Sequence, residues 1–87
     1  MHDGGMEMLD ELNTSRKVVG VKQLRKALKE GKVLRAYAAE NADPCLTDPL
    51  AEQCESLGVE LVFVPTMAEL GKACGISVGA AAAGLLV

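Results

Sequence analysis

The fold of this chain is decided by residues 17–39, KVVGVKQLRKALKEGKVLRAYAA, where apolar residues change their spacing twice. The centre of this stretch, Val21 to Glu30, is predicted to be a helix because its apolar residues recur at helical spacing. Gly31 is expected to end that helix. Lys17 to Gly20 is either a very short strand or an extended lead into the helix, and Val33 to Ala39 is predicted to be a buried strand. The apolar stripe of the helix consists of Val21, Leu24, Ala27 and Leu28.

A second helix and a further strand are predicted after residue 40. Asn41 to Pro44 has the composition of a turn. We expect Thr47 or Asp48 to cap the next helix, with Pro49 at an early position where its missing N–H costs nothing. Leu61 to Val64 is a continuous apolar run, which predicts a strand buried on both faces.

The last part of the chain carries another helix and another strand. Thr66 is expected to cap the helix, and Glu69 stands three residues later, as a capping box requires. Gly75 is expected to end this helix. Residues 76–79 then form a loop. Residues 80–87 are most simply a final strand, although their alanines fit a helix equally well.

Helices and strands therefore alternate along the chain, beginning with a short amphipathic helix predicted at Met6 to Leu12. Such alternation gives a central sheet with helices on both faces, which is the α/β class. A chain of 87 residues is long enough for one compact domain. We predict a single domain over residues 1–87, with residues 1–5 as a flexible terminus.

Positive charge is concentrated in one part of the chain. The formal net charge is -3, yet eight of the nine Lys and Arg residues lie between Arg16 and Arg35, where only Glu30 opposes them. Phosphate binding depends on the local density of Lys and Arg, so this window favours a nucleic-acid partner, although a solvated helix face has the same composition. The eight residues are Arg16, Lys17, Lys22, Arg25, Lys26, Lys29, Lys32 and Arg35.

The chain offers few groups for metal binding or catalysis. Cys45, Cys54 and Cys74 show no CxxC spacing, and the one histidine, His2, lies near the start of the chain. A zinc site needs about four well-spaced ligands, and a cysteine nucleophile needs a base beside it. We therefore expect no metal, no cofactor and no enzymatic activity.

Two further classes of protein are excluded by composition. Tyr37 and Phe63 are the only aromatic residues, and both stand in apolar strands, so a stacking platform for single-stranded RNA is excluded. The longest apolar run, residues 78–87, is far shorter than the roughly 20 residues of a membrane-spanning helix. An RNA-binding protein of this composition would have to read shape, groove edges and phosphates through its basic helix.

Three stretches of the chain resemble the L7Ae/L30e family of kink-turn-binding ribosomal proteins, and in particular its short bacterial members. They are residues 20–31, GVKQLRKALKEG, residues 39–44, AENADP, and residues 70–81, LGKACGISVGAA. With the order of elements, the resemblance extends over about residues 6–87. It implies a three-layer α/β/α sandwich with a four-stranded mixed sheet.

The resemblance also implies a site for the kink-turn, a bent RNA motif with tandem sheared G·A pairs and an extruded nucleotide. The glycine before the basic helix would allow close backbone approach, and the helix would contact guanine edges and phosphates. The loop before the last strand would cover the extruded nucleotide. The RNA-binding residues that this implies are Gly20, Lys22, Gln23, Arg25, Lys26, Lys29, Ile76, Ser77 and Val78.

One position departs from part of the family. Archaeal members have Asn-Glu where this chain has Lys22 and Gln23, and the bacterial members share the Lys-Gln pair. Gln accepts hydrogen bonds from a guanine without a charge, while Lys adds a less selective attraction to phosphate. We expect this pair to change the affinity and the preferred kink-turn sequence rather than the class of RNA.

The predicted function is that of a monomeric, cytoplasmic RNA-binding protein that recognises kink-turns and is ribosome-associated. The alternative is a protein–protein adaptor of the same fold, with the acidic helix from Asp48 to Leu57 as its surface. The basic window discriminates between the two, because an adaptor has no need for eight cations within twenty residues.

Overall fold

The computed structural model describes residues 16–87 of the chain, so the helix predicted at residues 6–12 and the terminus at residues 1–5 lie outside the described residues. Strands and helices alternate through the described part, as predicted. They are β1 (Lys17–Val19), α2 (Val21–Lys29), β2 (Val33–Ala39), α3 (Pro44–Leu57), β3 (Leu61–Val64), α4 (Met67–Ala73) and β4 (Ala82–Leu86).

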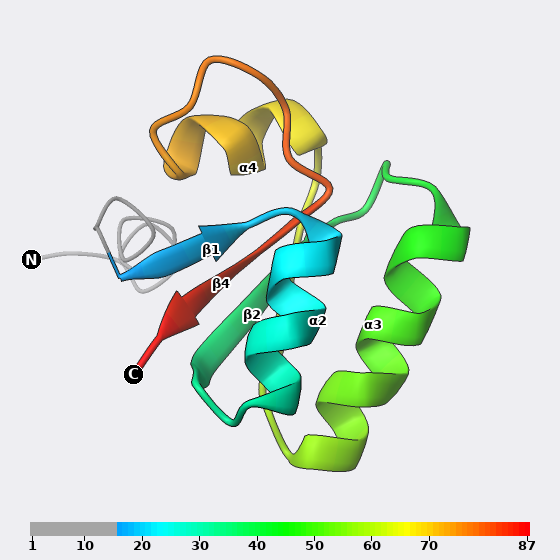
Figure 1. The fold of residues 1–87 in the computed structure, drawn as a ribbon. Helices are drawn as coiled ribbons and strands as arrows, with labels where there is room; N and C mark the ends of the chain where they lie inside the picture. The colour runs from blue at the N-terminus through cyan, green and yellow to red at the C-terminus, as the bar shows by residue number, and fades with distance from the viewer. Residues whose placement is uncertain (1–15) are drawn as a thin grey trace, which may run out of the picture.

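The four strands form one mixed sheet in the order β1-β4-β2-β3. The last strand, β4, lies in the middle and pairs antiparallel with β1 and with β2. β2 and β3 are parallel and are joined through α3, as a parallel pair requires a crossover (Figure 1). The four-stranded mixed sheet is therefore confirmed.

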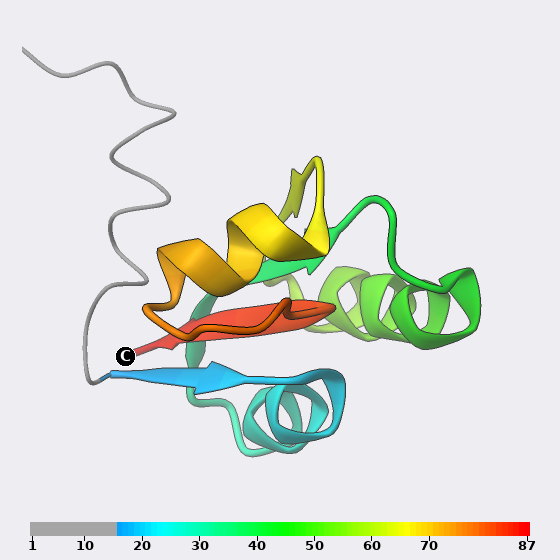
Figure 2. The ribbon, with the colours of Figure 1, turned by 90° about the horizontal axis from the view of Figure 1, so that it is seen from above.

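The helices cover both faces of this sheet, which makes the predicted three layers. α2 and α3 lie on one face and α4 lies on the other (Figure 2). Successive residues of β2 serve the two faces in turn: Ala36 and Ala38 pack with Leu24 and Leu50 beneath α2 and α3, and Tyr37 packs on the other side. The α/β/α sandwich is confirmed.

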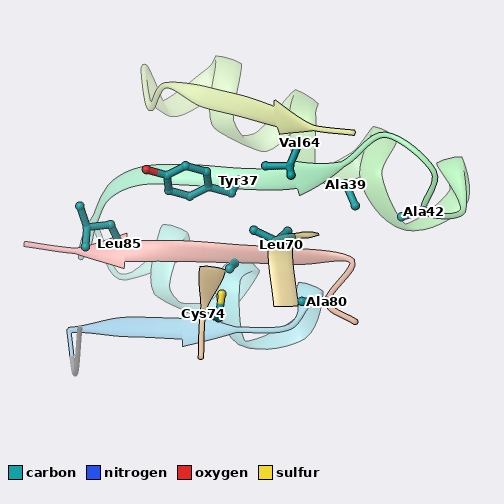
Figure 3. Close-up of a cluster of buried hydrophobic side chains, with 9 residues drawn as sticks. Tyr37, Ala39, Ala42, Val64, Leu70, Cys74, Ala80 and Leu85 are labelled. Carbon is teal, nitrogen blue, oxygen red and sulfur yellow. The ribbon is translucent and has the colours of Figure 1, made fainter. Parts of the chain in front are cut away.

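Tyr37 is the centre of the core on the α4 side. Its side chain is fully buried and lies beside Val64 of β3 and Leu85 of β4 (Figure 3). Leu70 and Cys74 approach the same cluster from α4. One large aromatic residue among small and medium side chains fills this layer.

A glycine lets α2 lie close to the sheet. A Cβ atom added to Gly84 of β4 would stand 2.4 Å from Cδ1 of Leu24, the fully buried residue at the centre of α2. A side chain at position 84 would therefore require the Leu24 side chain to shift.

Helix α3 begins earlier than predicted, so neither Thr47 nor Asp48 is its cap. The Asp43 side chain accepts a hydrogen bond from the Cys45 N–H at 2.9 Å, and Pro44 follows it as the first helical residue. Pro49 consequently stands inside the helix, and Thr47 is buried. The local signal from Pro49 was misleading because an equally good cap and proline pair stands one turn earlier.

The prediction that β3 is buried on both faces is wrong. Phe63 is 51% exposed, Leu61 and Val62 are half-buried, and only Val64 is fully buried. The cause is the position of β3 at the edge of the sheet, where one side has no neighbouring strand. An apolar run of four residues does not distinguish an edge strand from a central one.

Candidate RNA interface

The N-terminus of α2 has no side-chain cap. Gly20 is the N-cap residue, has φ 108° and supplies no side chain to the first N–H groups of the helix. Only glycine adopts this conformation without strain. The N–H of Gly20 donates to the Ala82 carbonyl at 2.8 Å, which fixes the start of α2 beside the start of β4. The first N–H groups of α2 therefore have no side-chain cap, and the positive end of the helix dipole lies at the same place.

A row of lysines follows on the outer surface of the helix. Lys22, Lys26 and Lys29 are exposed, and they lie one helical turn apart along α2. Among residues 16–87, no carboxylate forms an ion pair with any of the three. Elsewhere in the basic window, Lys32 lies 3.5 Å from Glu30 and Arg35 lies 3.0 Å from Glu60. The unpaired charge is therefore concentrated on α2.

Arg25 is placed differently from these lysines. Its Nε donates to Oε1 of Gln53 at 3.2 Å, and Nε2 of Gln53 donates back to the Arg25 carbonyl at 3.1 Å. This reciprocal pair joins α2 to α3. Arg25 therefore forms part of the wall of a groove between the two helices. The residues that line the groove are Val21, Lys22, Arg25, Lys26, Lys29, Leu46 and Gln53.

In the loop at residues 76–79, one side chain packs against the core and others are exposed to solvent. Ile76 is half-buried and packs against the core cluster on the α4 side of the sheet, whereas Ser77 and Val78 are exposed, Val78 by 68%. Ile76 therefore holds the loop, and the part of the predicted apolar cover that faces outward consists of Ser77 and Val78.

The basic helix and this loop are joined through the start of β4. The chain runs from the loop into β4 beside the first turn of α2 (Figure 1), where Gly20 bonds to Ala82. The start of α2 and the start of β4, which follows the loop, thus lie at the same end of the sheet.

A family model described as the ribosomal protein L7Ae/L30e/S12e/Gadd45 family matches residues 5–87. The chain belongs to this family. It is 45% identical over 75 residues to an RNA-binding protein of Geobacillus sp. (strain WCH70), which covers 86% of this chain and 92% of that protein. It is also 37% identical over 68 residues to the large ribosomal subunit protein eL8 of Halobacterium salinarum, covering 77% of this chain and 57% of that protein.

A solved structure supports the fold of this L7Ae-family member. The Giardia lamblia 15.5kD RNA binding protein superimposes with a TM-score of 0.88 at 26% sequence identity, covering 100% of this chain and 78% of that one. The backbone is thus retained although about three quarters of the aligned residues differ.

The second stretch that resembles the family, residues 39–44, serves to position α4 as well as to begin α3. Oδ1 of Asn41 accepts a hydrogen bond from the Met67 N–H at 2.8 Å, at the first turn of α4, which Thr66 caps as predicted. The role of Asn41 was missed from the sequence because its partner lies 26 residues away.

The buried cysteines are structural rather than reactive. Burial raises the pKa of the Cys54 and Cys74 thiols, and the charge of Lys17 only partly opposes that rise at Cys74. Within residues 16–87 no three His, Cys, Asp or Glu side chains gather as a metal site would require. The same residues contain no helix long and apolar enough to cross a membrane.

Proposed function

We propose that this protein binds RNA and recognises the kink-turn. The observation that carries the proposal is the row of three unpaired lysines on α2, a helix without a side-chain cap whose start is hydrogen-bonded to the residue that begins β4, just after the exposed loop. Phosphates are attracted by the lysines, and a helix N-terminus adds free N–H donors. The RNA-binding relatives of the same family favour an RNA partner over other anions.

The proposed roles follow from the position of each side chain. Lys22 and Gln23, in the exposed first turn of α2, donate to guanine O6 and N7 or to nearby phosphates. Lys26 reaches base edges or phosphates from the second turn, and Lys29 reaches phosphates only. Arg25 lines the groove beside the lysines while its hydrogen bonds to Gln53 hold α2 against α3.

The loop supplies the second contact. Ser77 and Val78 cover the extruded nucleotide, and half-buried Ile76 anchors the loop from below. The protein stabilises a bent conformation that the RNA already visits, because a ligand shifts such an equilibrium only through its different affinities for the two states. It acts in this proposal by binding alone, as a cytoplasmic monomer associated with the ribosome.

An adaptor function is the second candidate, and one observation favours it. Asp48, Glu52 and Glu55 are all exposed on α3, so that helix presents an acidic surface to the solvent. In that case partner proteins would bind to α3, and the lysines of α2 would be a solvated face.

A gel-shift titration tests the proposal against this alternative. The probe is an RNA with a kink-turn, and the control is the same RNA with its G·A pairs replaced by Watson–Crick pairs. Kink-turn recognition predicts tighter binding to the first RNA. Equal affinity for the two would contradict kink-turn recognition, and no binding to either would favour the adaptor.

A further inference from the structure

A buried glycine of α4 lies directly beneath the loop. A Cβ atom built on Gly71 would stand 2.0 Å from the carbonyl oxygen of Val78 and 3.0 Å from its carbonyl carbon. Both are backbone atoms, so no rotation of a side chain could relieve the overlap. The loop and α4 are therefore closer at this point than any residue other than glycine allows.

Hydrogen bonds attach the loop to α4 on both sides of Val78. The N–H of Ile76 donates to the Gly71 carbonyl at 3.1 Å, and the N–H of Ala80 donates to the Met67 carbonyl at 3.0 Å. The N–H of Met67 is in turn held by the Asn41 side chain at 2.8 Å. The loop thus takes its position from the backbone of α4, and α4 takes its position from residue 41.

We propose that Gly71 is a positioning residue of the RNA interface: its missing side chain seats the Val78 carbonyl against α4 and so places Ser77 and Val78 for contact with the RNA. This inference rests on the kink-turn function proposed above. A methyl group at position 71 would have to move the Val78 carbonyl by at least 1 Å, because Cβ contacts under 3.0 Å are essentially never found. Val78 would move with its own carbonyl.

The chain supplies a matched control. Gly84→Ala adds the same methyl group beneath α2, on the other face of the sheet, where it meets Leu24 instead of the loop. Both substitutions disturb close packing and lower stability, but only Gly71→Ala displaces the loop. A purely structural role for Gly71 predicts the same RNA phenotype for the two variants.

The experiment measures the affinity of wild-type, Gly71→Ala and Gly84→Ala protein for three RNAs: a kink-turn, the same RNA without its extruded nucleotide, and a plain duplex. The preference for the extruded nucleotide is the ratio of the affinities for the first RNA and the second. We expect Gly71→Ala to lower this ratio about tenfold, while its affinity for the plain duplex changes by less than about twofold. Gly84→Ala should keep the wild-type preference. A Gly71→Ala protein that keeps that preference would overturn the inference.

Hydrogen exchange separates this inference from the proposed function. Gly71→Ala should speed exchange of the Ala80 N–H, which bonds to Met67, and should leave the Gly20 N–H, which bonds to Ala82, at its wild-type rate. Unchanged exchange at Ala80 would show that Gly71 does not seat the loop. If exchange changes as expected but wild-type protein does not prefer the kink-turn, the proposed function is wrong. The conclusion that Gly71 positions the loop against α4 then still holds.

A second variant covers the case in which Gly71→Ala does not fold. Asn41→Ala removes the hydrogen bond to Met67 without adding any atom to the core, and Asn41→Asp keeps an acceptor there. We expect Asn41→Ala to lower the preference for the extruded nucleotide in the same direction as Gly71→Ala, and Asn41→Asp to restore it. Equal preferences in wild-type and Asn41→Ala protein would count against a loop positioned through α4.

Discussion

The two parts of the candidate interface are built in different ways. α2 is a regular helix whose lysines stand on its own surface, and it packs on the sheet through buried residues such as Leu24 and Leu28. The loop at residues 76–79 has no regular structure, and its place is set by backbone contacts with Gly71 and Met67. α2 therefore contributes positive charge to the candidate interface, and the loop contributes a surface of fixed shape.

Under the proposed function, this difference separates general affinity for RNA from selectivity for the bent motif. Attraction between lysine and phosphate acts on any RNA and weakens as salt is added. An apolar side chain such as Val78 contributes only where a base is available to cover, so its effect depends on the conformation of the RNA. We therefore assign general RNA affinity to α2 and selection of the bent motif to the loop.

Both parts rest on one sheet, so a core substitution should harm them together. Tyr37 is fully buried, and Tyr37→Ala should lower the free energy of unfolding by about 3–5 kcal/mol, measured by urea denaturation. Phe63→Ala is the matched control: Phe63 is 51% exposed, and we expect a loss below about 2 kcal/mol. Similar losses in the two variants would contradict the described core.

Removal of a single lysine should show where affinity resides. Lys26→Ala should weaken RNA binding by about 1–3 kcal/mol if Lys26 contacts a base edge. Lys72→Ala, which removes an exposed lysine from α4, should have a much smaller effect. Affinities for a kink-turn RNA measured by titration would decide, and equal losses at the two positions would exclude α2 as the centre of attraction.

The dependence of binding on salt should separate the two parts more finely. Lys29→Ala should reduce the slope of log affinity against log salt by about 1, since one phosphate contact is lost. Ser77→Ala in the loop should leave that slope unchanged because its hydroxyl carries no charge. Binding curves at several salt concentrations give both slopes, and a changed slope in Ser77→Ala would show that the division of roles is wrong.

The helical part of the site could be predicted from local sequence. The stripe of Val21, Leu24 and Leu28 sets the period of α2, and the same period places its lysines on the opposite side. The α/β class and the capping of α4 by Thr66 also follow from short stretches. Such features depend on residues within one or two turns of each other.

The remaining features depend on contacts between distant residues. From the sequence alone, Gly71 is a residue that disfavours a short helix. Its role becomes clear only from the position of the Val78 carbonyl, which leaves no space for a side chain. Asn41 looks like an ordinary turn residue, and Arg25 looks like one more cation, until their partners Met67 and Gln53 are known. The exposure of Phe63 follows from the order of strands in the sheet, which an apolar run does not reveal.

Energy transfer between dyes on the two arms of a kink-turn RNA tests the central claim most directly. Titration with wild-type protein should bring the arms together as binding proceeds. Val78→Asp places an acid where Val78 is 68% exposed, so it should weaken bending at least about threefold more than it weakens binding to a plain duplex. Tight binding of wild-type protein while the arms stay extended would contradict the account, and the protein would then be a general duplex binder.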